Sequence, residues 1–381
     1  MYFIGNKKRI ASHSALVVVS WMQAMRQSWH KTALIYFLMA ALFVPMALAQ
    51  QAQWDALNQQ LSDLYKNGRY QEGIPVAQEA LRIAEATFGA THFNVATSLN
   101  NLAEIYRSLG RFAEAKPLYQ RAMKVTESTM GPENTLMAAA LNNLGELERG
   151  QGNYAAAEPL YRQAIQLREK ILGAEHPDVA QALNNLALLN AAQNKAAEAE
   201  PLYLRALAIY RKAYGESHLL VAATMSNLAE LYRSMEKFAL AESNFEKSIE
   251  MTEKLLGAKD PKVASIRNNL ALLYATENKT KEAERNFQTA LAIQEQAFGR
   301  SSAATGTTLT NLATFYQDRG RFAEAEPLWR RVLQIAETVY GADSPNLSGP
   351  LDSLTEIYKK MGRDAEAAQT AERSRKLSAS R

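Results

Sequence analysis

The chain of 381 residues contains no cysteine. This absence excludes disulfide scaffolds, thiolate nucleophiles, iron–sulfur clusters and cysteine-ligated zinc. Histidine is scarce, with five copies, and the sequence has no GxxxxGK[ST] or GxGxxG string for nucleotides and no GxSxG elbow for a serine nucleophile. We therefore expect no cofactor, no metal site and no catalytic residues.

Acidic residues are absent from residues 1–49, which contain five basic residues: Lys7, Lys8, Arg9, Arg26 and Lys31. The whole chain has 43 Lys and Arg against 39 Asp and Glu, so removal of these five leaves 38 basic and 39 acidic residues. A nearly neutral body lacks the positive surface that a phosphate backbone requires. The net charge of +4 therefore belongs to the leader, and we expect no nucleic-acid partner.

Long hydrophobic runs are also missing, apart from one short run near the N-terminus. Residues 33–44 are uniformly apolar, follow the basic Lys31 and precede the small-residue site Ala47-Leu48-Ala49. This order is typical of a secretory signal peptide, and 12 residues fall short of the ~20 that span a bilayer. We expect cleavage before Gln50.

The leader thus predicts a periplasmic or secreted protein. We assign residues 25–49 to the signal peptide and residues 1–24 to a start-site overhang or an extended n-region. An uncleaved leader is the alternative, and it would anchor the chain to the inner membrane. Only in that case do we expect contact with a membrane.

The rest of the sequence repeats with a period of 42 residues. Two residue types recur at this spacing in seven copies each: Leu102, Leu144, Leu186, Leu228, Leu270, Leu312 and Leu354, and Gly89, Gly131, Gly173, Gly215, Gly257, Gly299 and Gly341. A fixed period between 20 and 50 residues indicates a solenoid of stacked supersecondary units. We expect residues 50–381 to form one such domain, with about eight helix pairs over residues 53–375.

The pattern within each repeat predicts two helices, because apolar residues recur at helical spacing and strand alternation is absent. Three residues after each closing glycine stands a candidate N-cap: His92, Asn134, His176, His218, Asp260, Ser302 or Ser344. The closing glycine itself predicts a left-handed helix end. A second turn, inside each pair, carries glycine or asparagine except at Glu236.

The repeat resembles the tetratricopeptide repeat in its packing residues Ala103, Tyr106, Ala115, Tyr119 and Ala122. The strings NNLALLY at 268–274 and AEPLYLRAL at 199–207, with the 42-residue length, resemble the kinesin light chain variety. The resemblance implies an all-α, right-handed superhelical solenoid whose first helices line a concave groove. It also implies a protein or extended-peptide partner.

One polar series is not explained by exposure to solvent. Six asparagines lie 42 residues apart in the first helices: Asn101, Asn143, Asn185, Asn227, Asn269 and Asn311. Asparagine is a poor helix former, because its side chain competes with the backbone. The position resembles the one with which tetratricopeptide arrays hold a bound peptide. The alternative is a ladder in which neighbouring asparagines bond to each other and fix helix stacking, and both roles can hold.

The sequence therefore predicts a non-enzymatic, exported scaffold that binds a protein or an extended peptide in its groove. Two alternatives remain open: a membrane-anchored assembly factor, and an enzyme or enzyme subunit that uses the groove for substrate. The sequence makes no prediction of the partner or of the oligomeric state.

Overall fold

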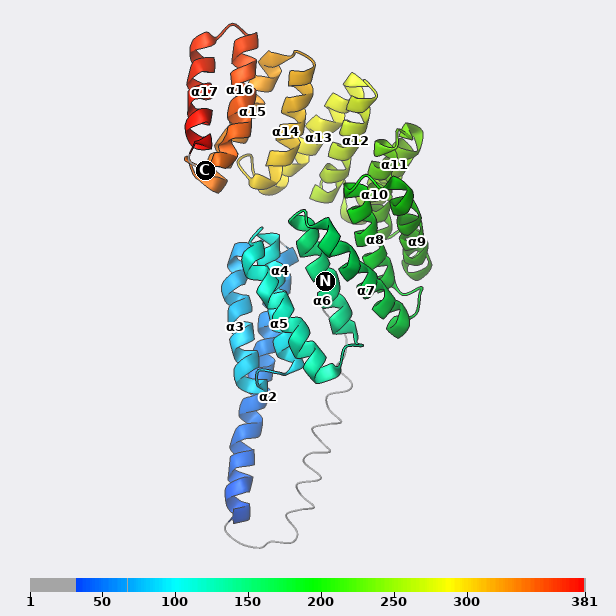
Figure 1. Ribbon diagram of the computed structural model, residues 1–381, viewed down its shortest axis with the longest axis vertical. Helices are drawn as coiled ribbons and strands as arrows, with labels where there is room; N and C mark the ends of the chain where they lie inside the picture. The colour runs from blue at the N-terminus through cyan, green and yellow to red at the C-terminus, as the bar shows by residue number, and fades with distance from the viewer. Residues whose placement is uncertain (1–31, 67, 380–381) are drawn as a thin grey trace. The chain divides into compact units, whose positions relative to one another are not determined.

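The computed structural model describes residues 32–66 and 68–379, and the side chains of residues 48–65 and 68–379. These residues form helices and turns without any strand, so the all-α class is confirmed. They belong to two compact units, Met1–Ala174 and Glu175–Arg381, which are described separately (Figure 1). The expected start-site overhang, residues 1–24, and the start of the expected signal peptide, residues 25–31, lie outside the described residues.

The first unit contains six described helices in three pairs. They are α2 (Thr32–Lys66), α3 (Tyr70–Phe88), α4 (Phe93–Ser108), α5 (Phe112–Met130), α6 (Thr135–Gly150) and α7 (Tyr154–Leu172). Helix α2 is longer than the others, because it continues from the apolar run of the leader into the first helix of the first pair. It passes through the expected cleavage position at Gln50 without a break.

The second unit contains five pairs. Its elements are α8 (Pro177–Ala192), α9 (Ala196–Tyr214), α10 (Leu219–Ser234), α11 (Phe238–Leu256), α12 (Pro261–Thr276), α13 (Thr280–Phe298), α14 (Ala303–Asp318), α15 (Phe322–Tyr340), the short 3-10 helix η2 (Pro345–Leu347), α16 (Ser348–Lys360) and α17 (Asp364–Ser378). A 16-residue helix, a three-residue turn, a 19-residue helix and a four-residue loop account for the 42-residue period.

The helix starts follow the predicted capping pattern. All seven expected N-cap side chains accept a hydrogen bond from a backbone N–H in the first turn of the next helix. His92, for example, accepts at Nδ1 from the N–H of Asn94 at 3.2 Å. Proline occupies the first helical position at Pro177 and Pro261, where its missing N–H costs nothing.

The glycines that close each pair differ from the expected left-handed end in one dihedral. Their φ lies between 75° and 93°, as predicted, but their ψ lies between 153° and 177°. This region is essentially restricted to glycine, whereas the common left-handed region has ψ near +47°. Each glycine N–H still bonds to the carbonyl four residues earlier, so the helix end is satisfied.

The turn inside each pair accepts other residues. Its φ is also positive, between 57° and 77°, at Asn194, Glu236, Asn278 and five glycines. Glu236 therefore adopts the same backbone conformation as the glycines and does not change the turn. Its side chain makes this conformation costly by about 1–2 kcal/mol.

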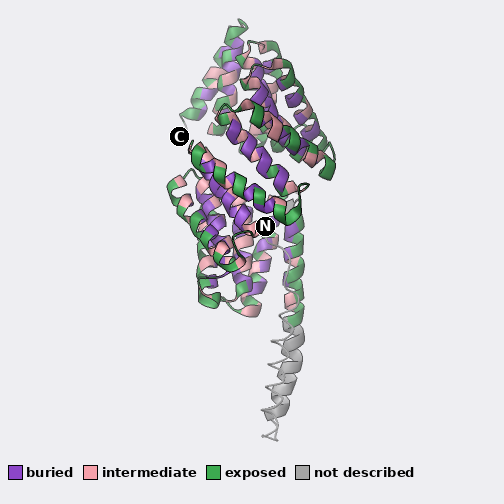
Figure 2. Ribbon diagram, turned by 90° about the vertical axis from the view of Figure 1, so that its right-hand side faces the viewer, coloured by how far each residue is buried: buried purple, intermediate pink, exposed green. Residues whose placement is uncertain are grey.

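Within each unit, the core lies between the helices of each pair and between consecutive pairs (Figure 2). The alanines that recur every 42 residues from Ala115 to Ala367 are at most 3% exposed. The aromatic residues four positions later, from Tyr119 to Trp329, are at most 7% exposed. The first pair has glycine at this alanine position: a Cβ on Gly73 would lie 3.0 Å from Cδ1 of Ile105. Both series are thus core residues, as predicted.

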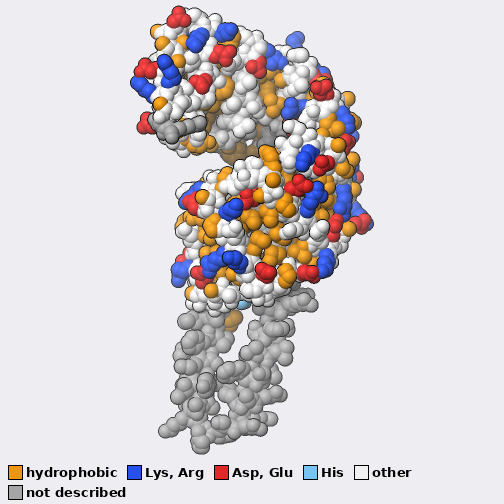
Figure 3. Space-filling view, viewed as in Figure 1, with side chains coloured by type: hydrophobic (Ala, Val, Ile, Leu, Met, Phe, Trp, Pro, Cys, Tyr) orange, Lys and Arg blue, Asp and Glu red, His pale blue; other side chains and the backbone are white. Residues whose placement is uncertain are grey.

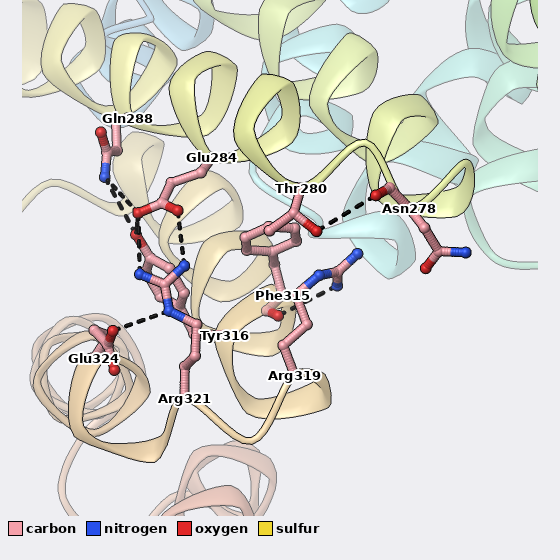
Figure 4. A network of polar contacts seen from close by, with 9 residues as sticks. All are labelled: Asn278, Thr280, Glu284, Gln288, Phe315, Tyr316, Arg319, Arg321 and Glu324. Carbon is pink, nitrogen blue, oxygen red and sulfur yellow. Dashed lines mark hydrogen bonds and ion pairs between the residues drawn. The ribbon is translucent and has the colours of Figure 1, made fainter.

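A polar link that sequence analysis did not identify joins consecutive pairs at their turns (Figure 4). In the pair formed by α14 and α15, Tyr316 donates its hydroxyl to Glu284 of α13 at 2.8 Å. Arg321 donates to the same carboxylate at 2.7 Å and lies over the Tyr316 ring, 4.4 Å from its centroid. The carboxylate of α13 therefore holds both ends of the next turn.

The same link recurs with a period of 42 residues. Tyr232, Glu200 and Lys237 form it between α9 and the next pair, and Tyr274, Glu242 and Lys279 form it one repeat later. In the first unit the charges are exchanged: Lys116 pairs with Glu148 at 2.6 Å, and Asn153 donates to Glu148 at 3.0 Å. The carboxylates in these links therefore bond to neighbouring helix pairs and are not simply solvated.

The first helices of successive pairs also contact each other directly. Such contacts join α4 to α6, α8 to α10, α10 to α12, and α12 to α14. Among the described helices, successive second helices make at most weaker contact. Within each unit, the first helices are therefore the more closely spaced row, and their outward-facing side chains form one continuous face.

Candidate functional site

The six predicted asparagines all lie on this face of the first helices, on α4, α6, α8, α10, α12 and α14. Each precedes a buried leucine of the core. Asn185 is buried, with 6% of its surface exposed, and the other five are partly exposed. The structure thus places the series in register within each unit, at the boundary between the core and solvent.

Three of the asparagines form rungs to the preceding helix pair. In each rung the side-chain Nδ2 donates to the Oδ1 of an asparagine one helix row earlier: Asn101 to Asn58 at 2.8 Å, Asn227 to Asn184 at 3.2 Å, and Asn311 to Asn268 at 3.0 Å. The acceptors belong to the position directly before the series. The ladder that sequence analysis gave as the alternative is therefore formed at these three sites.

The rung fails where the acceptor differs. Asn269 faces Ser226 in the acceptor position of α10, and it instead accepts from its own neighbour, Asn268, at 3.3 Å. Between α4 and α6, Oδ1 of Asn100 is buried and has no hydrogen-bond partner among the described residues. Nothing in the structure explains why Asn143 does not reach it.

In each rung the donating asparagine uses its Nδ2 atom and not its Oδ1 atom. The Oδ1 atoms of Asn101, Asn227 and Asn311 accept no hydrogen bond from the part of the chain that the structure describes. They are not among the buried polar atoms without a partner, so they reach solvent. A side-chain amide has both a donor and an acceptor, and here the donor is bound while the acceptor is available.

A charged cluster occupies the same face in the first unit. Glu104 accepts two hydrogen bonds from Arg107, one from the Tyr65 hydroxyl at 2.6 Å and one from the Tyr119 hydroxyl at 2.8 Å. Arg107 also approaches Glu146 of α6 at 3.4 Å. These contacts form a cluster that ties α2, α4, α5 and α6 together.

Burial and hydrogen bonding act on Glu104 in opposite directions. Burial alone would raise the pKa of its carboxyl, but the bonds from Arg107, Tyr65 and Tyr119 outweigh it and hold the pKa below its usual value. Glu104 is therefore ionised, and its carboxylate is held by hydrogen bonds from three neighbouring side chains. In the second unit, the equivalent pair of Glu230 and Arg233 lacks the tyrosine partners and is more exposed.

In α8 and α12 the charged pair is replaced by apolar residues. These are Leu188 with Ala191 and Leu272 with Ala275, and all four pack partly buried against the core of the second unit. Within the second unit, the face of the first helices therefore changes from apolar residues on α8 to charged residues on α10 and back to apolar residues on α12. On the side shown in Figure 3, Lys and Arg side chains are interspersed with Asp and Glu over the described surface.

The three histidines of the repeat region serve as helix caps. His92, His176 and His218 each use Nδ1 to accept a backbone N–H at a helix start. Among residues 32–66 and 68–379, no three His, Asp or Glu side chains are grouped closely enough to hold a metal ion. No helix within these residues has both the length and the apolar character needed to cross a bilayer.

Several solved structures share the fold. A Rap protein in complex with Competence and Sporulation Factor superposes with a TM-score of 0.53, with 15% sequence identity, over 86% of this chain and 98% of that one. BtubC (BKLC) from P. vanneervenii has 23% identity, a TM-score of 0.49, and coverage of 63% of this chain and 92% of its own. No curated protein sequence matches the chain.

A putative kinesin light chain from Podosopora anserina, with nearly identical TPR-like repeats, has 24% identity and a TM-score of 0.45, over 54% of this chain and 97% of its own. The family model described as tetratricopeptide repeat matches residues 56–128, 136–212, 195–254, 220–296 and 304–380. A second model of the same description matches residues 100–170. These matches cover most of the sequence and all the helix pairs, and the chain belongs to the tetratricopeptide repeat family.

Proposed function

We propose that the chain is a non-enzymatic scaffold that binds an extended segment of another protein along the face of its first helices. One observation supports this most strongly: Asn101, Asn227 and Asn311 have their amide nitrogens held by rungs and their oxygens open to solvent. An amide fixed in this way is preorganised to accept a backbone N–H, which lowers the entropic cost of binding.

The fold and the remaining side chains are consistent with this proposal. Repeat arrays use such extended surfaces for binding. The Rap protein with a similar fold was crystallised in complex with Competence and Sporulation Factor. The three histidines of the repeat region are engaged in helix capping, which argues for binding and against acid–base catalysis. The interspersed charges of the surface favour a protein partner over nucleic acid.

We also propose that the protein acts after export, with the leader removed before Gln50. The first residues after that point already hold the first helix in place. Thr87 of α3 donates to the Gln50 side chain at 3.0 Å, and Asn94 of α4 donates to Gln51 at 3.3 Å. A mature chain that begins at Gln50 would keep these contacts. The anchored alternative would keep the leader as well.

The binding role is tested with a library of displayed random 12-residue peptides selected on the purified chain. Asn227→Ala and Asn311→Ala together remove two acceptor oxygens, each worth about 0.5–1.5 kcal/mol, so affinity for the selected peptides should fall about tenfold. Asn244→Ala is the matched control, because Asn244 lies on a second helix and donates to the carbonyl oxygen of Leu240 in the same helix.

The same variants distinguish binding from stacking. Loss of two rungs also lowers stability, so each melting curve is measured with each affinity. A lower melting temperature with unchanged affinity would show that the asparagines serve only the ladder. A failure to select any peptide whose affinity responds to the double variant would contradict a groove that reads peptide backbone.

A further inference from the structure

One helix pair of the second unit contains an open cavity. The cavity has a volume of about 320 Å³ and lies between α14 and α15. Its lining residues recur at every third or fourth position, from Ala303 to Asn311 on α14 and from Val332 to Tyr340 on α15. Two helix faces that would normally pack against each other therefore stand apart here.

The cavity exists because three residues differ from those of the other repeats. The first is Gly306, which replaces an alanine that is at most 1% exposed in the five pairs from α4–α5 to α12–α13: Ala96, Ala138, Ala180, Ala222 and Ala264. Gly306 is partly exposed, and a Cβ built on it meets no atom within 4 Å. The space beside this residue is empty and accessible.

The second is Val332, opposite Gly306. Its equivalents are small and fully buried: Ala122, Ala164, Ala206, Ser248 and Ala290. In α10 and α11 these two positions touch, because Ser248 donates to the carbonyl oxygen of Ala222 at 2.7 Å. The larger Val332 is instead partly exposed, as expected where the two helices do not close.

The third is Ala336, one turn further along α15. In the five pairs from α4–α5 to α12–α13 its equivalents are longer side chains that are at most 7% exposed: Thr126, Arg168, Tyr210, Thr252 and Gln294. The first pair has the buried Ala84 at this position. Ala336 lines the cavity together with Gly306. Three positions of the pocket thus differ from those of the five pairs from α4–α5 to α12–α13.

The chemistry of the pocket is apolar with a polar rim. Val332, Ile335 and Val339 contribute aliphatic surface, and no charged side chain lines it. Thr307, Thr310 and Asn311 contribute hydroxyl and amide groups. The volume is at the low end of the 300–1,000 Å³ typical of ligand sites, which suits one side chain better than a cofactor.

We propose that this pocket receives a single aromatic or branched aliphatic side chain of the extended partner segment, while Oδ1 of Asn311 accepts a backbone N–H beside it. The inference rests on the proposed function and assigns to it a specificity pocket. The occupant is uncharged, because a charged group would lose its hydration among aliphatic walls without gaining a counter-ion.

The test uses two blocked tripeptides, acetyl-Ala-Phe-Ala-amide and acetyl-Ala-Lys-Ala-amide, titrated into the full chain labelled with ¹³C at Ile, Leu and Val methyl groups. The Phe peptide should shift the methyl signals of Val332, Ile335 and Val339 in a saturable manner, and the Lys peptide should not. Equal responses to both peptides, or no response of Ile335 to the Phe peptide, would overturn the proposal.

Two variants locate the binding. Ala336→Gln, which restores the residue of the preceding repeat, should weaken the Phe peptide at least tenfold. Ala323→Gln, an exposed site on the same helix, should leave it unchanged. Gly306→Leu fills the pocket from within, so it should block the peptide and raise the urea midpoint. Undiminished binding in both pocket variants would overturn the proposal even if one of them folded poorly.

The outcome also separates the pocket from the groove. If Leu272 methyl signals respond to the Phe peptide while Ile335 signals do not, the pocket proposal fails and the binding face stands. If benzyl alcohol shifts Ile335 but neither tripeptide does, the site takes a small apolar molecule and the peptide assignment is wrong. If Ile335 responds but the asparagine variants leave displayed-peptide affinity unchanged, the pocket stands and the backbone role of the asparagines fails.

Discussion

The Tyr316 hydroxyl donates to the Glu284 carboxylate at 2.8 Å and thereby joins α14 to the second helix of the preceding pair. Arg321 neutralises the same carboxylate and covers the tyrosine ring. The contact joins two side chains that are 32 residues apart. It recurs because the 42-residue repeat recurs. Stacking of the repeats in the second unit thus combines an alanine–aromatic core with a row of polar links at the turns.

We expect Tyr316→Phe to destabilise the protein by about 0.5–1.5 kcal/mol for each hydrogen bond lost, because it removes the bonds of the hydroxyl to Glu284 and from Gln288 without opening a cavity. Urea unfolding followed by circular dichroism provides the measurement. Tyr214→Phe is the control, since Tyr214 is 44% exposed and stacks on His218 through its ring. Similar losses in both variants would show that the hydroxyl bond to Glu284 contributes nothing.

Replacement of a glycine that closes a pair should lower the free energy of unfolding more than replacement of a glycine in the turn inside a pair. Gly257 has φ 93° and ψ 153°, a conformation that a Cβ makes costly, so we expect Gly257→Ala to destabilise by about 1–3 kcal/mol. Gly320, with φ 69°, occupies the turn position that Glu236 occupies in another pair, so Gly320→Ala should lose less stability. Urea midpoints of the two variants test this order, and the reverse order would contradict the dihedral argument.

The carboxyl of Glu104 should make stability depend on pH. Its pKa in the folded chain is lowered by Arg107, Tyr65 and Tyr119, against the effect of burial, so its ionised form stabilises folding above the unfolded value of about 4.3. This contribution is lost as the pH falls through the folded-state pKa. Glu104→Gln should therefore be less stable than the parent at pH 7, and its urea midpoint should fall less between about pH 5 and about pH 3.

Glu127→Gln, at an exposed position of α5, is the matched control for this experiment. It should keep the parent's pH profile. If Glu104→Gln follows the parent as closely as the control does, the cluster around Glu104 does not stabilise the first unit through its charge.

The proposal that the protein is exported predicts which residue stands at the N-terminus of the mature chain. If the leader is removed after Ala49, protein from the native envelope should begin at Gln50, and its intact mass should lack residues 1–49. Lys31→Glu should reduce export, because it places an acid in the basic region before the apolar run. Detection of peptides from residues 25–49 in the native protein would support the anchored alternative instead.

Much of the fold could be predicted from the sequence, because its signals are local and repeat seven times. The N-cap residues from His92 to Ser344 bond as expected, since capping needs only neighbouring backbone N–H groups. The core leucine, alanine and aromatic series are buried as expected, since a helix face follows from spacing alone. The closing glycines were recognised by position, but their ψ between 153° and 177° depends on how the next helix leaves the loop.

The candidate site needed the tertiary structure. The six asparagines could be found from their period, but whether each forms a rung depends on the residue across the helix row, such as Asn268 for Asn311 and Ser226 for Asn269. The Tyr316–Glu284 link joins residues from different pairs, and the pocket at Gly306 depends on how far α14 stands from α15. Periodicity determines which residues share a face, whereas distances between faces depend on the summed volumes of side chains from separate helices, and only packing decides those distances.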